Sequence, residues 1–285
     1  MNDVLSLFPK EFDNYHEPFV GGGSVFLSVL VEIQKGNMKM NGNMFISDLN
    51  ENLIMLYNVI KHHPTEFHKE ITRLFEEYDR CKFCDKSKEH RNPTSKSDAM
   101  ETREGYFYWS RREFNNITIE NNNDMIHKSA LLLLLNKTCF RGIYREGPNG
   151  FNVPYGNYKT TPKYPTLNYI NDMSHMFENV QFQKQDFQTS LVHVSDNDFV
   201  YMDPPYLPID AKSFTGYTYD GFSETHHNQL FTTIKSMKNK FVMSNAGVQR
   251  INNEFVNYNI MYIECRRAIN SKNPGSKVYE VLVSN

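Results

Sequence analysis

The sequence predicts an α/β protein with a parallel sheet, interrupted by an insert. Three observations predict this fold. Strand-like and helical segments alternate over residues 1–60, the same alternation returns over residues 165–285, and the stretch 61–164 lacks it. Alternation of this kind is typical of βαβ units, whose parallel strands are joined by right-handed crossovers. We therefore expect one sheet domain formed by residues 1–60 and 165–285, with residues 61–164 inserted into it.

The amino-terminal segments follow the βαβα order. Residues 14–20, "NYHEPFV", form the first expected strand and lead into three consecutive glycines. Residues 24–35 have the apolar spacing of a helix, residues 44–48, "MFISD", read as a strand, and residues 51–63 are helical again. This order indicates two neighbouring parallel strands connected by a helix.

The carboxyl-terminal half is richer in strands. One helix is expected at residues 223–237, between two of them. The expected strands lie in residues 178–187, 196–203, 239–246, 258–265 and 277–285.

The middle of the chain has a different composition. Residues 79–105 are polar and predict loops, whereas residues 106–116 and 125–137 predict helices. Residues 138–165 are rich in Gly, Pro, Tyr and Arg, and they predict a hairpin or extended loop around "GPNG". This composition favours a separate, loop-rich insert.

Composition excludes several classes of protein. The 285 residues are 39% hydrophobic and 22% charged, with a formal net charge of −2, which favours a folded chain with a sizeable core. Four scattered cysteines do not predict a disulfide framework. The acidic start and the short apolar run at 130–135 predict neither a secretory signal nor a membrane span. We expect a cytoplasmic protein, or an intracellular one of viral origin.

The glycine cluster is the first candidate site. Gly21, Gly22 and Gly23 lie between a strand and a helix, where they allow a ligand to approach the backbone and the free N–H groups of the helix. Asp48 ends the next strand, the position from which a carboxylate binds ribose hydroxyls in doubly wound folds. The pair indicates a nucleoside-containing cofactor. A plain turn also selects glycine, and Asp48 could instead cap the next helix.

A second candidate site follows a later strand. The tetrapeptide Asp203, Pro204, Pro205 and Tyr206 comes at the carboxyl end of "FVYM", the edge where open α/β sheets bind ligands. The prolines stiffen the backbone and hold the carboxylate, the carbonyl oxygens and the tyrosine ring in fixed relation. Two acceptors and an aromatic face suit an exocyclic amine on a stacked base. The alternative is a stiff turn carrying a surface aspartate.

Together these motifs resemble those of a known family. The chain is similar to the Dam-type, alpha-group DNA adenine-N6 methyltransferases, in the order glycine motif, recognition insert and "DPPY". The likeness covers most of the chain and is carried by "EPFVGGGSVF", "SDLNENLIMLYNVI", "GFNVPYGNYK", "FVYMDPPYLP", "FTGYTYDGFS" and "FVMSNAG". The resemblance implies a Rossmann-like class I S-adenosylmethionine-dependent methyltransferase fold with a target-recognition domain at 61–164, which flips adenine out of double-stranded DNA.

The resemblance also implies roles for individual residues. Phe19, Gly21 and Gly23 would line the methionine end of S-adenosylmethionine, Asp48 would bind its ribose, and Asp186 in "KQDF" would lie by its adenine. A helix cap is the alternative role of Asp186.

In the same family pattern, Asp203 and the Pro204 carbonyl would accept from the target amine, while Tyr206 would stack on the extruded base. The reaction would be a direct methyl transfer with no covalent enzyme intermediate.

The insert carries the expected contacts to DNA. The resemblance makes Arg145 the candidate for a base-edge contact to guanine, with Phe140 and Pro154 touching nearby bases. A first basic cluster lies between residues 137 and 163, where the charged residues are Lys137, Arg141, Arg145, Glu146, Lys159 and Lys163. Near the carboxyl end, Arg266 and Arg267 belong to a second basic cluster, "CRRAINSKNPGSK". Such clusters neutralise phosphates, although either of the two could be an ordinary solvated face.

Two departures from the family pattern affect the prediction. GATC-type members usually read Tyr-Asn-Gly-Leu where this chain has Phe140-Arg141-Gly142-Ile143, which brings it closer to CATG-type relatives. Members also usually carry Lys-Trp-Xaa-Gly-Gly-Lys before the glycine motif, and the residues before Gly21 contain no such segment. This motivates the alternative of a catalytically weak or inactive DNA-binding member. A methyltransferase of RNA or protein side chains is disfavoured, since protein-glutamine members carry Asn at the Asp203 position.

The resemblance also bears on a partner, and the cysteine spacing bears on a metal site. We expect a protecting partner of a restriction endonuclease, without a stable complex between the two. Cys81 and Cys84 with His90 could contribute to a zinc site, but no second cysteine pair follows at the spacing that zinc ribbons need. The prediction is therefore no metal, with two loop cysteines at these positions.

Overall fold

The chain folds into two compact units in the computed structural model, which describes residues 1–84, 90–208, 222–266 and 277–285. The first, here called the sheet unit, contains Met1–Glu51 and the described residues from Asn179 onward. The second, the helical unit, contains Asn52–Glu178.

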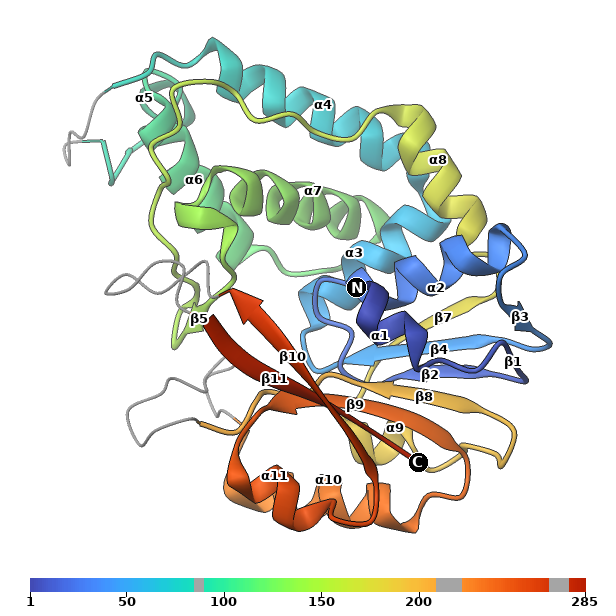
Figure 1. Ribbon diagram of the computed structural model, residues 1–285. Helices are drawn as coiled ribbons and strands as arrows, with labels where there is room; N and C mark the ends of the chain where they lie inside the picture. Colours follow the sequence, from blue (N-terminus) through green and yellow to red (C-terminus); the bar gives the residue numbers. More distant parts are fainter. Residues whose placement is uncertain (85–89, 209–221, 267–276) are drawn as a thin grey trace. The chain divides into compact units, whose positions relative to one another are not determined.

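A seven-stranded sheet with the order β10-β11-β9-β8-β2-β4-β7 forms the sheet unit (Figure 1). Within this sheet β11 runs antiparallel to both of its neighbours, and the other pairings are parallel. The strands are β2 (Tyr15–Glu17), β4 (Met44–Asp48), β7 (Val180–Lys184), β8 (Phe199–Met202), β9 (Lys240–Ala246), β10 (Asn259–Arg266) and β11 (Lys277–Ser284).

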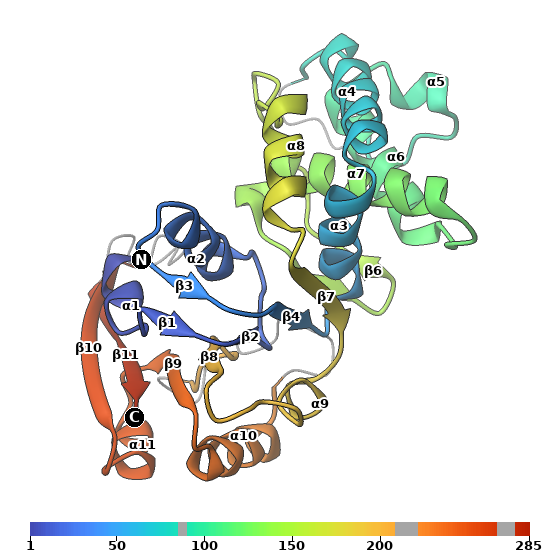
Figure 2. The same cartoon turned by 90° about the vertical axis from the view of Figure 1, so that its right-hand side faces the viewer.

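Helices cover both faces of this sheet. Figure 2 shows α2 (Ser24–Gln34) over one face, and α10 (Glu224–Ser236) and α11 (Gln249–Glu254) over the other. Side chains alternate accordingly, since successive residues of a strand point to opposite faces. Val200 and Met202 of β8 belong to the buried cluster under α10, whereas Phe199 packs on Phe8, with ring centroids 4.5 Å apart.

The remaining elements of the sheet unit are short. The helices α1 (Asn2–Ser6) and α9 (Phe187–Ser190) flank the sheet, and two residue pairs form a separate parallel ladder, β1 (Glu11–Phe12) with β3 (Lys39–Met40).

The predicted strands and helices of this unit are confirmed, with two differences. The first strand was expected over residues 14–20, but β2 ends at Glu17 because Pro18 has no N–H with which to continue the ladder. The alternation predicted a parallel sheet, whereas β11 runs antiparallel to its neighbours. It follows β10 in the chain and lies beside it, which is the arrangement of an antiparallel pair.

The helical unit packs its helices around an aromatic and leucine-rich core. Its fully buried side chains include Tyr78, Tyr106, Leu131 and Leu135. The helices are α3 (Glu51–His62), α4 (Pro64–Arg80), α5 (Lys96–Ala99), α6 (Arg103–Asn116), α7 (Asn122–Thr138) and α8 (Leu167–Met176). The predicted hairpin is confirmed as β5 (Glu146–Gly147) paired with β6 (Gly150–Phe151). Since α3 and α8 also belong to this compact unit, it extends beyond residues 61–164, whose recognition role stays a prediction.

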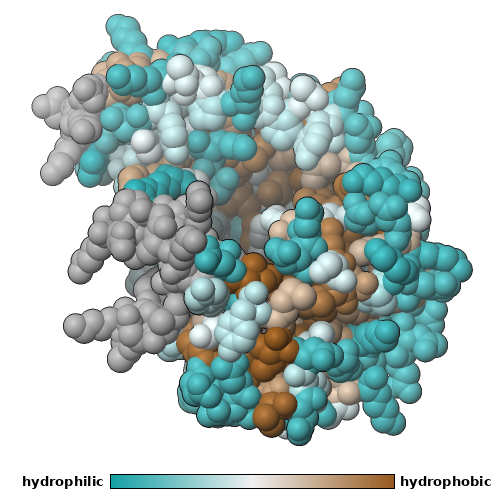
Figure 3. Space-filling model, in the orientation of Figure 1, coloured by the Kyte–Doolittle hydropathy of each residue, from teal (hydrophilic) through white to brown (hydrophobic). Residues whose placement is uncertain are grey.

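The described residues contain no helix with both the length and the apolar composition that crossing a lipid bilayer requires. Hydrophilic residues predominate on the face drawn in Figure 3, and the hydrophobic ones show between them.

An ion-pair network joins three helices of the helical unit. His127 of α7 lies 2.6 Å from Glu70 of α4 and 3.1 Å from Glu113 of α6. Burial of His127 lowers its pKa, but the hydrogen bonds to Glu113 and Glu70 outweigh burial and raise the pKa to about 9. The imidazolium therefore holds α4, α6 and α7 together at neutral pH.

We expect this network to make stability depend on pH in one direction. Because the folded pKa of His127 lies above its unfolded value, the stabilisation is fully present below pH ~6.5 and is lost as pH rises through about 9. His127→Gln should therefore lower the free energy of unfolding by about 1–3 kcal/mol at pH 6, and by less at pH 10.

Denaturant titrations followed by the fluorescence of Trp109, the single tryptophan, report on this unit. The control is His175→Gln, because His175 is 79% exposed and lies 3.5 Å from Glu178. If His127→Gln lowers the free energy of unfolding equally at pH 6 and pH 10, the charged interaction of His127 with Glu70 and Glu113 is contradicted.

Candidate active site

The two predicted motifs meet at the point where the strand order reverses. From β2, the chain adds β4 and β7 on one side of the sheet and later β8 and β9 on the other. Open α/β sheets bind ligands in the crevice at such a switch point, outside the carboxyl ends of the strands. The glycine turn follows β2 and "DPPY" follows β8, so both motifs lie at the carboxyl ends of adjacent strands.

The glycine turn is open toward its surroundings. Gly21 and Gly23 have positive φ values of 46° and 73°, which side chains with a Cβ rarely adopt, and Gly23 is the N-cap of α2. A Cβ placed on Gly21 or Gly22 would meet no atom within 4 Å. Close packing inside the protein therefore does not require glycine at positions 21 and 22. Gly21 and Gly22 leave a space in front of the backbone that a ligand can fill.

Asp48 ties the glycine turn to the neighbouring strand. Its carboxylate accepts hydrogen bonds from the N–H of Gly21 at 2.9 Å and from the N–H of Asn50 at 2.8 Å. A carboxylate offers about four acceptor positions, so these two bonds leave capacity for a ligand hydroxyl. The structure brings Gly21 and Asp48 together.

Glu17 is a buried carboxyl group that the sequence analysis missed. It lies at the end of β2 with only 2% of its surface exposed and accepts from the Tyr15 hydroxyl at 2.5 Å. It also accepts from the backbone N–H of Phe26 in α2. Burial, with Asp203 and Asp48 nearby, raises its pKa well above the usual range. The available signal was an acidic residue at the end of an expected strand, shortly before the glycine turn.

An aromatic cluster extends from the glycine turn. The ring of Phe19 stacks on Phe187 at 5.5 Å and meets the edge of Phe222 at 5.8 Å. Asp186 directly precedes Phe187 and caps α9, accepting from the N–H of Thr189 at 2.7 Å. Phe187 and Phe222 were not singled out from the sequence, because an aromatic residue beside a cap is also an ordinary core residue.

The Asp203 carboxyl is crowded by protein groups while the residue keeps accessible surface. The hydroxyl of Ser244 in β9 donates to its Oδ1 at 2.5 Å, and the Tyr206 hydroxyl also hydrogen-bonds this carboxyl. Removal from water raises the pKa of Asp203, and these two hydrogen bonds oppose the rise. Pro204 is buried, Pro205 and Tyr206 are half-buried, and the Tyr206 hydroxyl lies 3.4 Å from Glu280 of β11.

The residues expected to contact DNA are exposed in the helical unit. Phe140 and Pro154 lie side by side, because the Phe140 N–H donates to the Pro154 carbonyl at 2.9 Å. Arg141 has a left-handed backbone, φ 58°, and its guanidinium lies 5.2 Å from the Phe140 ring. Arg145 donates to the Asn152 side chain across the hairpin at 2.7 Å.

The second basic cluster is described only in part. The backbone of Arg266 ends β10. Arg267, Lys272 and most of the segment "FTGYTYDGFS" lie outside the described residues.

The cysteines do not form a nucleophile or metal site in the described ranges. Cys81 and Cys84 are free thiols, and the described residues contain no group of three or more metal-ligating side chains. Burial raises the pKa of Cys81 and of Cys139 to about 11, which keeps both thiols protonated at neutral pH.

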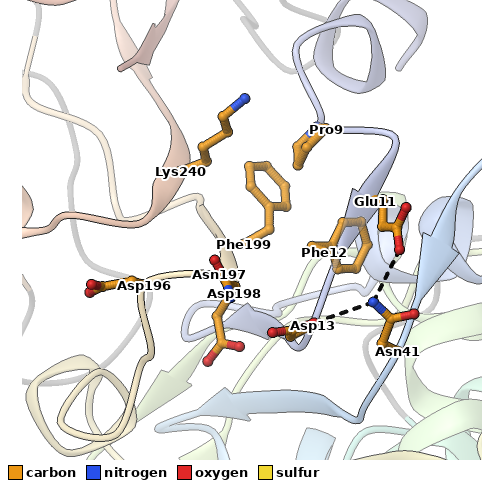
Figure 4. A pocket seen from close by; sticks show the side chains of 10 residues that line it. All are labelled: Pro9, Glu11, Phe12, Asp13, Asn41, Asp196, Asn197, Asp198, Phe199 and Lys240. Carbon is orange, nitrogen blue, oxygen red and sulfur yellow. Dashed lines mark hydrogen bonds between the residues drawn. The ribbon is translucent and has the colours of Figure 1, made fainter.

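A cavity of about 320 Å³ lies at the opposite edge of the sheet (Figure 4). It is lined by residues that precede β2 and β8, including Asp13, Asp196 and Asp198. Figure 4 shows Asn41 donating to Glu11 and to Asp13, each at 3.3 Å. Parallel strands direct their carboxyl ends away from this cavity, so it does not belong to the site that holds Asp203.

Comparison with known proteins agrees with this geometry. The type II methyltransferase M.MjaIII of Methanocaldococcus jannaschii is 32% identical over 298 residues, covering 100% of this chain and 94% of that protein. M1.LlaDCHI of Lactococcus lactis subsp. cremoris, also a type II methyltransferase, is 29% identical, covering 99% and 89%. The DNA adenine methylase of Escherichia coli K12 is 25% identical, covering 100% and 90%.

A family model described as D12 class N6 adenine-specific DNA methyltransferase matches residues 1–269, which include the glycine turn, the helical unit and "DPPY". The chain therefore belongs to the D12 class of N6 adenine-specific DNA methyltransferases.

Proposed function

We propose that this methyltransferase uses S-adenosylmethionine to methylate N6 of adenine in a short duplex site of the CATG or GATC type. The observation that carries the proposal is the placement of two motifs at one edge of the sheet. The glycine turn follows β2, the Asp203 carboxyl follows β8, and these strands are hydrogen-bonded neighbours.

The residues around the glycine turn fit the methyl donor. The open space in front of Gly21 and Gly22 suits a ligand that approaches the backbone, and Asp48 retains acceptor capacity for ribose hydroxyls. Phe19 and Gly23 would line its methionine end, and Asp186 would lie by its adenine. When bound, S-adenosylmethionine supplies a methyl group on a positively charged sulfonium. The neighbouring carboxyls of Glu17, Asp48 and Asp203 favour a cationic ligand.

Asp203 and the stiff turn after it would act on the target base. The amine nitrogen of adenine is a weak nucleophile because its lone pair is delocalised into the ring. Hydrogen bonds from the amine to the Asp203 carboxylate and the Pro204 carbonyl would favour the pyramidal, nucleophilic geometry of the nitrogen. Tyr206 would stack on the base. Pro205 restricts the turn. Positioning and electrostatic stabilisation then provide the catalysis.

The helical unit would supply sequence recognition. Arg145 is exposed on the hairpin and its guanidinium suits a bidentate contact to guanine. Phe140 and Pro154 would touch neighbouring bases, and Arg141 would read a second guanine or bind a phosphate. Arg266 and Arg267 would contribute further phosphate contacts.

We further propose that the enzyme protects DNA from a restriction endonuclease without forming a stable complex with it. Two similar proteins are named type II methyltransferases, which supports this role. Action on genomic DNA would place the enzyme in the cytoplasm, or inside a host cell if it is viral.

The function is tested by incubating the protein with unmethylated plasmid DNA and S-adenosylmethionine, then mapping modified bases by single-molecule sequencing. N6-methyladenine confined to one short motif supports the proposal. Methylation at scattered adenines would reject the site specificity. Retained DNA binding without transfer at high enzyme and donor concentrations would instead indicate a DNA-binding member that lacks activity.

Asp203→Ala should abolish methyl transfer, lowering kcat by at least about 100-fold, because the amine loses its charged acceptor. Binding to DNA should change by no more than about threefold, since phosphate contacts dominate affinity. Single-turnover assays and filter binding measure the two quantities. The control is Asp196→Ala, an exposed aspartate at the opposite edge of the sheet. Normal rates in Asp203→Ala would remove this carboxyl from the mechanism.

Gly21→Ala should weaken binding of S-adenosylhomocysteine, the product of the donor, by about tenfold or more. The added Cβ enters the open space before the turn and also strains a backbone with φ 46°. Gly36→Ala separates these effects, because Gly36 has φ 75° and equally open surroundings at the other end of α2. Calorimetry should show unchanged affinity in Gly36→Ala. Equal losses in both variants would mean that strain alone is responsible.

Arg145→Ala should relax sequence choice at one base pair, at a cost of about 1–3 kcal/mol on the specific site. Competition binding with duplexes substituted at each position measures this loss. Arg80→Ala is the control, since Arg80 is 69% exposed on α4 and pairs with Glu76. Equal losses on specific and random duplexes would identify Arg145 as a phosphate contact.

A further inference from the structure

The end of β9 lies directly against the catalytic turn. Met202 of β8 pairs with Met243 of β9, so Ser244 follows in register beside Asp203. The Ser244 hydroxyl lies 2.5 Å from Asp203 Oδ1 and 3.4 Å from the Met202 carbonyl oxygen. Only 4% of Ser244 is exposed. The shorter contact is a hydrogen bond to the Asp203 carboxyl, and such a bond is stronger when the carboxyl is ionised than when both groups are neutral.

A second hydroxyl orients the first. Tyr201 is buried on β8, and its hydroxyl donates to the Ser244 oxygen at 3.2 Å. A serine hydroxyl carries one proton and two acceptor positions. Tyr201 occupies an acceptor position of Ser244, and of the two acceptors within reach of the Ser244 proton, Asp203 Oδ1 at 2.5 Å is closer than the Met202 carbonyl at 3.4 Å. Burial, followed by the nearby Asp203, raises the pKa of Tyr201, so the phenol stays protonated and remains a donor.

The next residue of β9 fixes the backbone of the same turn. Asn245 is fully buried, and its side-chain oxygen accepts from the N–H of Leu207 at 3.0 Å and from the N–H of Ala246 at 2.9 Å. Leu207 directly follows the tetrapeptide. The amide nitrogen of Asn245 has no partner among the described residues. The oxygen of this side chain thus links the turn after Tyr206 to the end of β9.

We propose that Ser244 and Asn245 are positioning residues for methyl transfer: Ser244, oriented by Tyr201, fixes the rotamer of the Asp203 carboxylate, and Asn245 anchors the chain after Tyr206. The inference rests on the proposed role of Asp203 as acceptor for the target amine. Ser244 engages Oδ1 from within the protein and thereby sets the direction in which the carboxylate meets the base. The segment "FVMSNAG" thus acts with "DPPY" as one structural unit.

The decisive variant is Ser244→Ala. We expect kcat to fall by about 10- to 100-fold, the range that loss of one hydrogen bond to a charged group produces, while KM for DNA and for the donor changes by less than about threefold. The acidic limb of the kcat profile should move to higher pH, because a donor to the ionised form has been lost. Glu17, Glu280 and Tyr206 also face Asp203 and stay in place.

Two further variants test the arrangement itself. Ser244→Thr keeps the hydroxyl on a strand residue and should restore most of the turnover. Tyr201→Phe removes the orienting donor alone and should lower kcat by less than Ser244→Ala does. A Ser244→Thr enzyme as slow as Ser244→Ala would contradict the role of the hydroxyl.

Ser47→Ala is the matched control. Ser47 is also a buried strand serine, 1% exposed, and its hydroxyl bonds Ser190 at 2.9 Å rather than Asp203. The kcat of the Ser47→Ala enzyme should stay within about twofold of the wild-type value across the pH profile. Similar losses in Ser47→Ala and Ser244→Ala would mean that general loosening of the sheet is responsible, and the proposal would fail.

A readout without catalysis separates this inference from the proposed function. Carbon-13 NMR of the aspartate carboxyls, with Asp203→Asn to assign the signal, follows the titration of Asp203 in each variant. We expect the midpoint to rise in Ser244→Ala and to stay unchanged in Ser47→Ala. If the wild type is inactive but the titration midpoint of Asp203 still rises in Ser244→Ala, the proposed function is rejected, while the contact between Ser244 and Asp203 is supported. If the wild type is active but Ser244→Ala changes neither the titration midpoint of Asp203 nor kcat, the inference is overturned.

Discussion

The pairing of β2 with β8 depends on one buried carboxylate at the amino end of the sheet. Asp198 accepts from the backbone N–H and the side chain of Asn14, at 3.1 and 2.8 Å, and bonds His16 at 3.0 Å. It also accepts from the N–H of Ser195 at 2.9 Å. Burial raises the pKa of Asp198, but these hydrogen bonds outweigh burial and lower it. The ionised carboxylate therefore joins the segments that begin the two central strands.

The arrangement at the other edge follows from this pairing. With Tyr15 beside Phe199 and His16 beside Val200, β2 and β8 run in parallel and end side by side. The turns that follow them carry the open glycine backbone and the Asp203 carboxyl. The third strand, β9, contributes Ser244 and Asn245, which hold the Asp203 turn from the side. A change of register in either pairing would separate the Asp203 carboxyl from Ser244 and from the glycine turn, since one residue of slip reverses the direction of every side chain.

Several acidic groups gather at this edge, and their environments differ. Glu17 is enclosed by Tyr15 and α2, Asp48 bonds two backbone N–H groups, and Asp203 keeps accessible surface. Like charges placed close together are costly, and burial of Glu17 raises the pKa of its carboxyl. A cationic ligand reduces this cost. The acidic groups at this edge thus favour a positively charged ligand over a negatively charged one.

The sequence by itself determined the local features of this protein. The alternation of strands and helices predicted β4 and α3 closely, because apolar periodicity and caps act over a few residues. The residue types in "GGG" and "DPPY" predicted a backbone open to a ligand and a stiff acidic turn. The fold class and the family followed from these motifs and their order.

Only the tertiary structure decided which distant groups meet. Ser244 lies 41 positions from Asp203 in the chain, and their contact depends on β9 lying beside β8 in one register. The reversal of β11, the burial of Glu17 and the inclusion of α3 and α8 in the helical unit also depend on packing between elements. Strand order and register are set by the sum of such long-range contacts, which no local pattern of residues encodes.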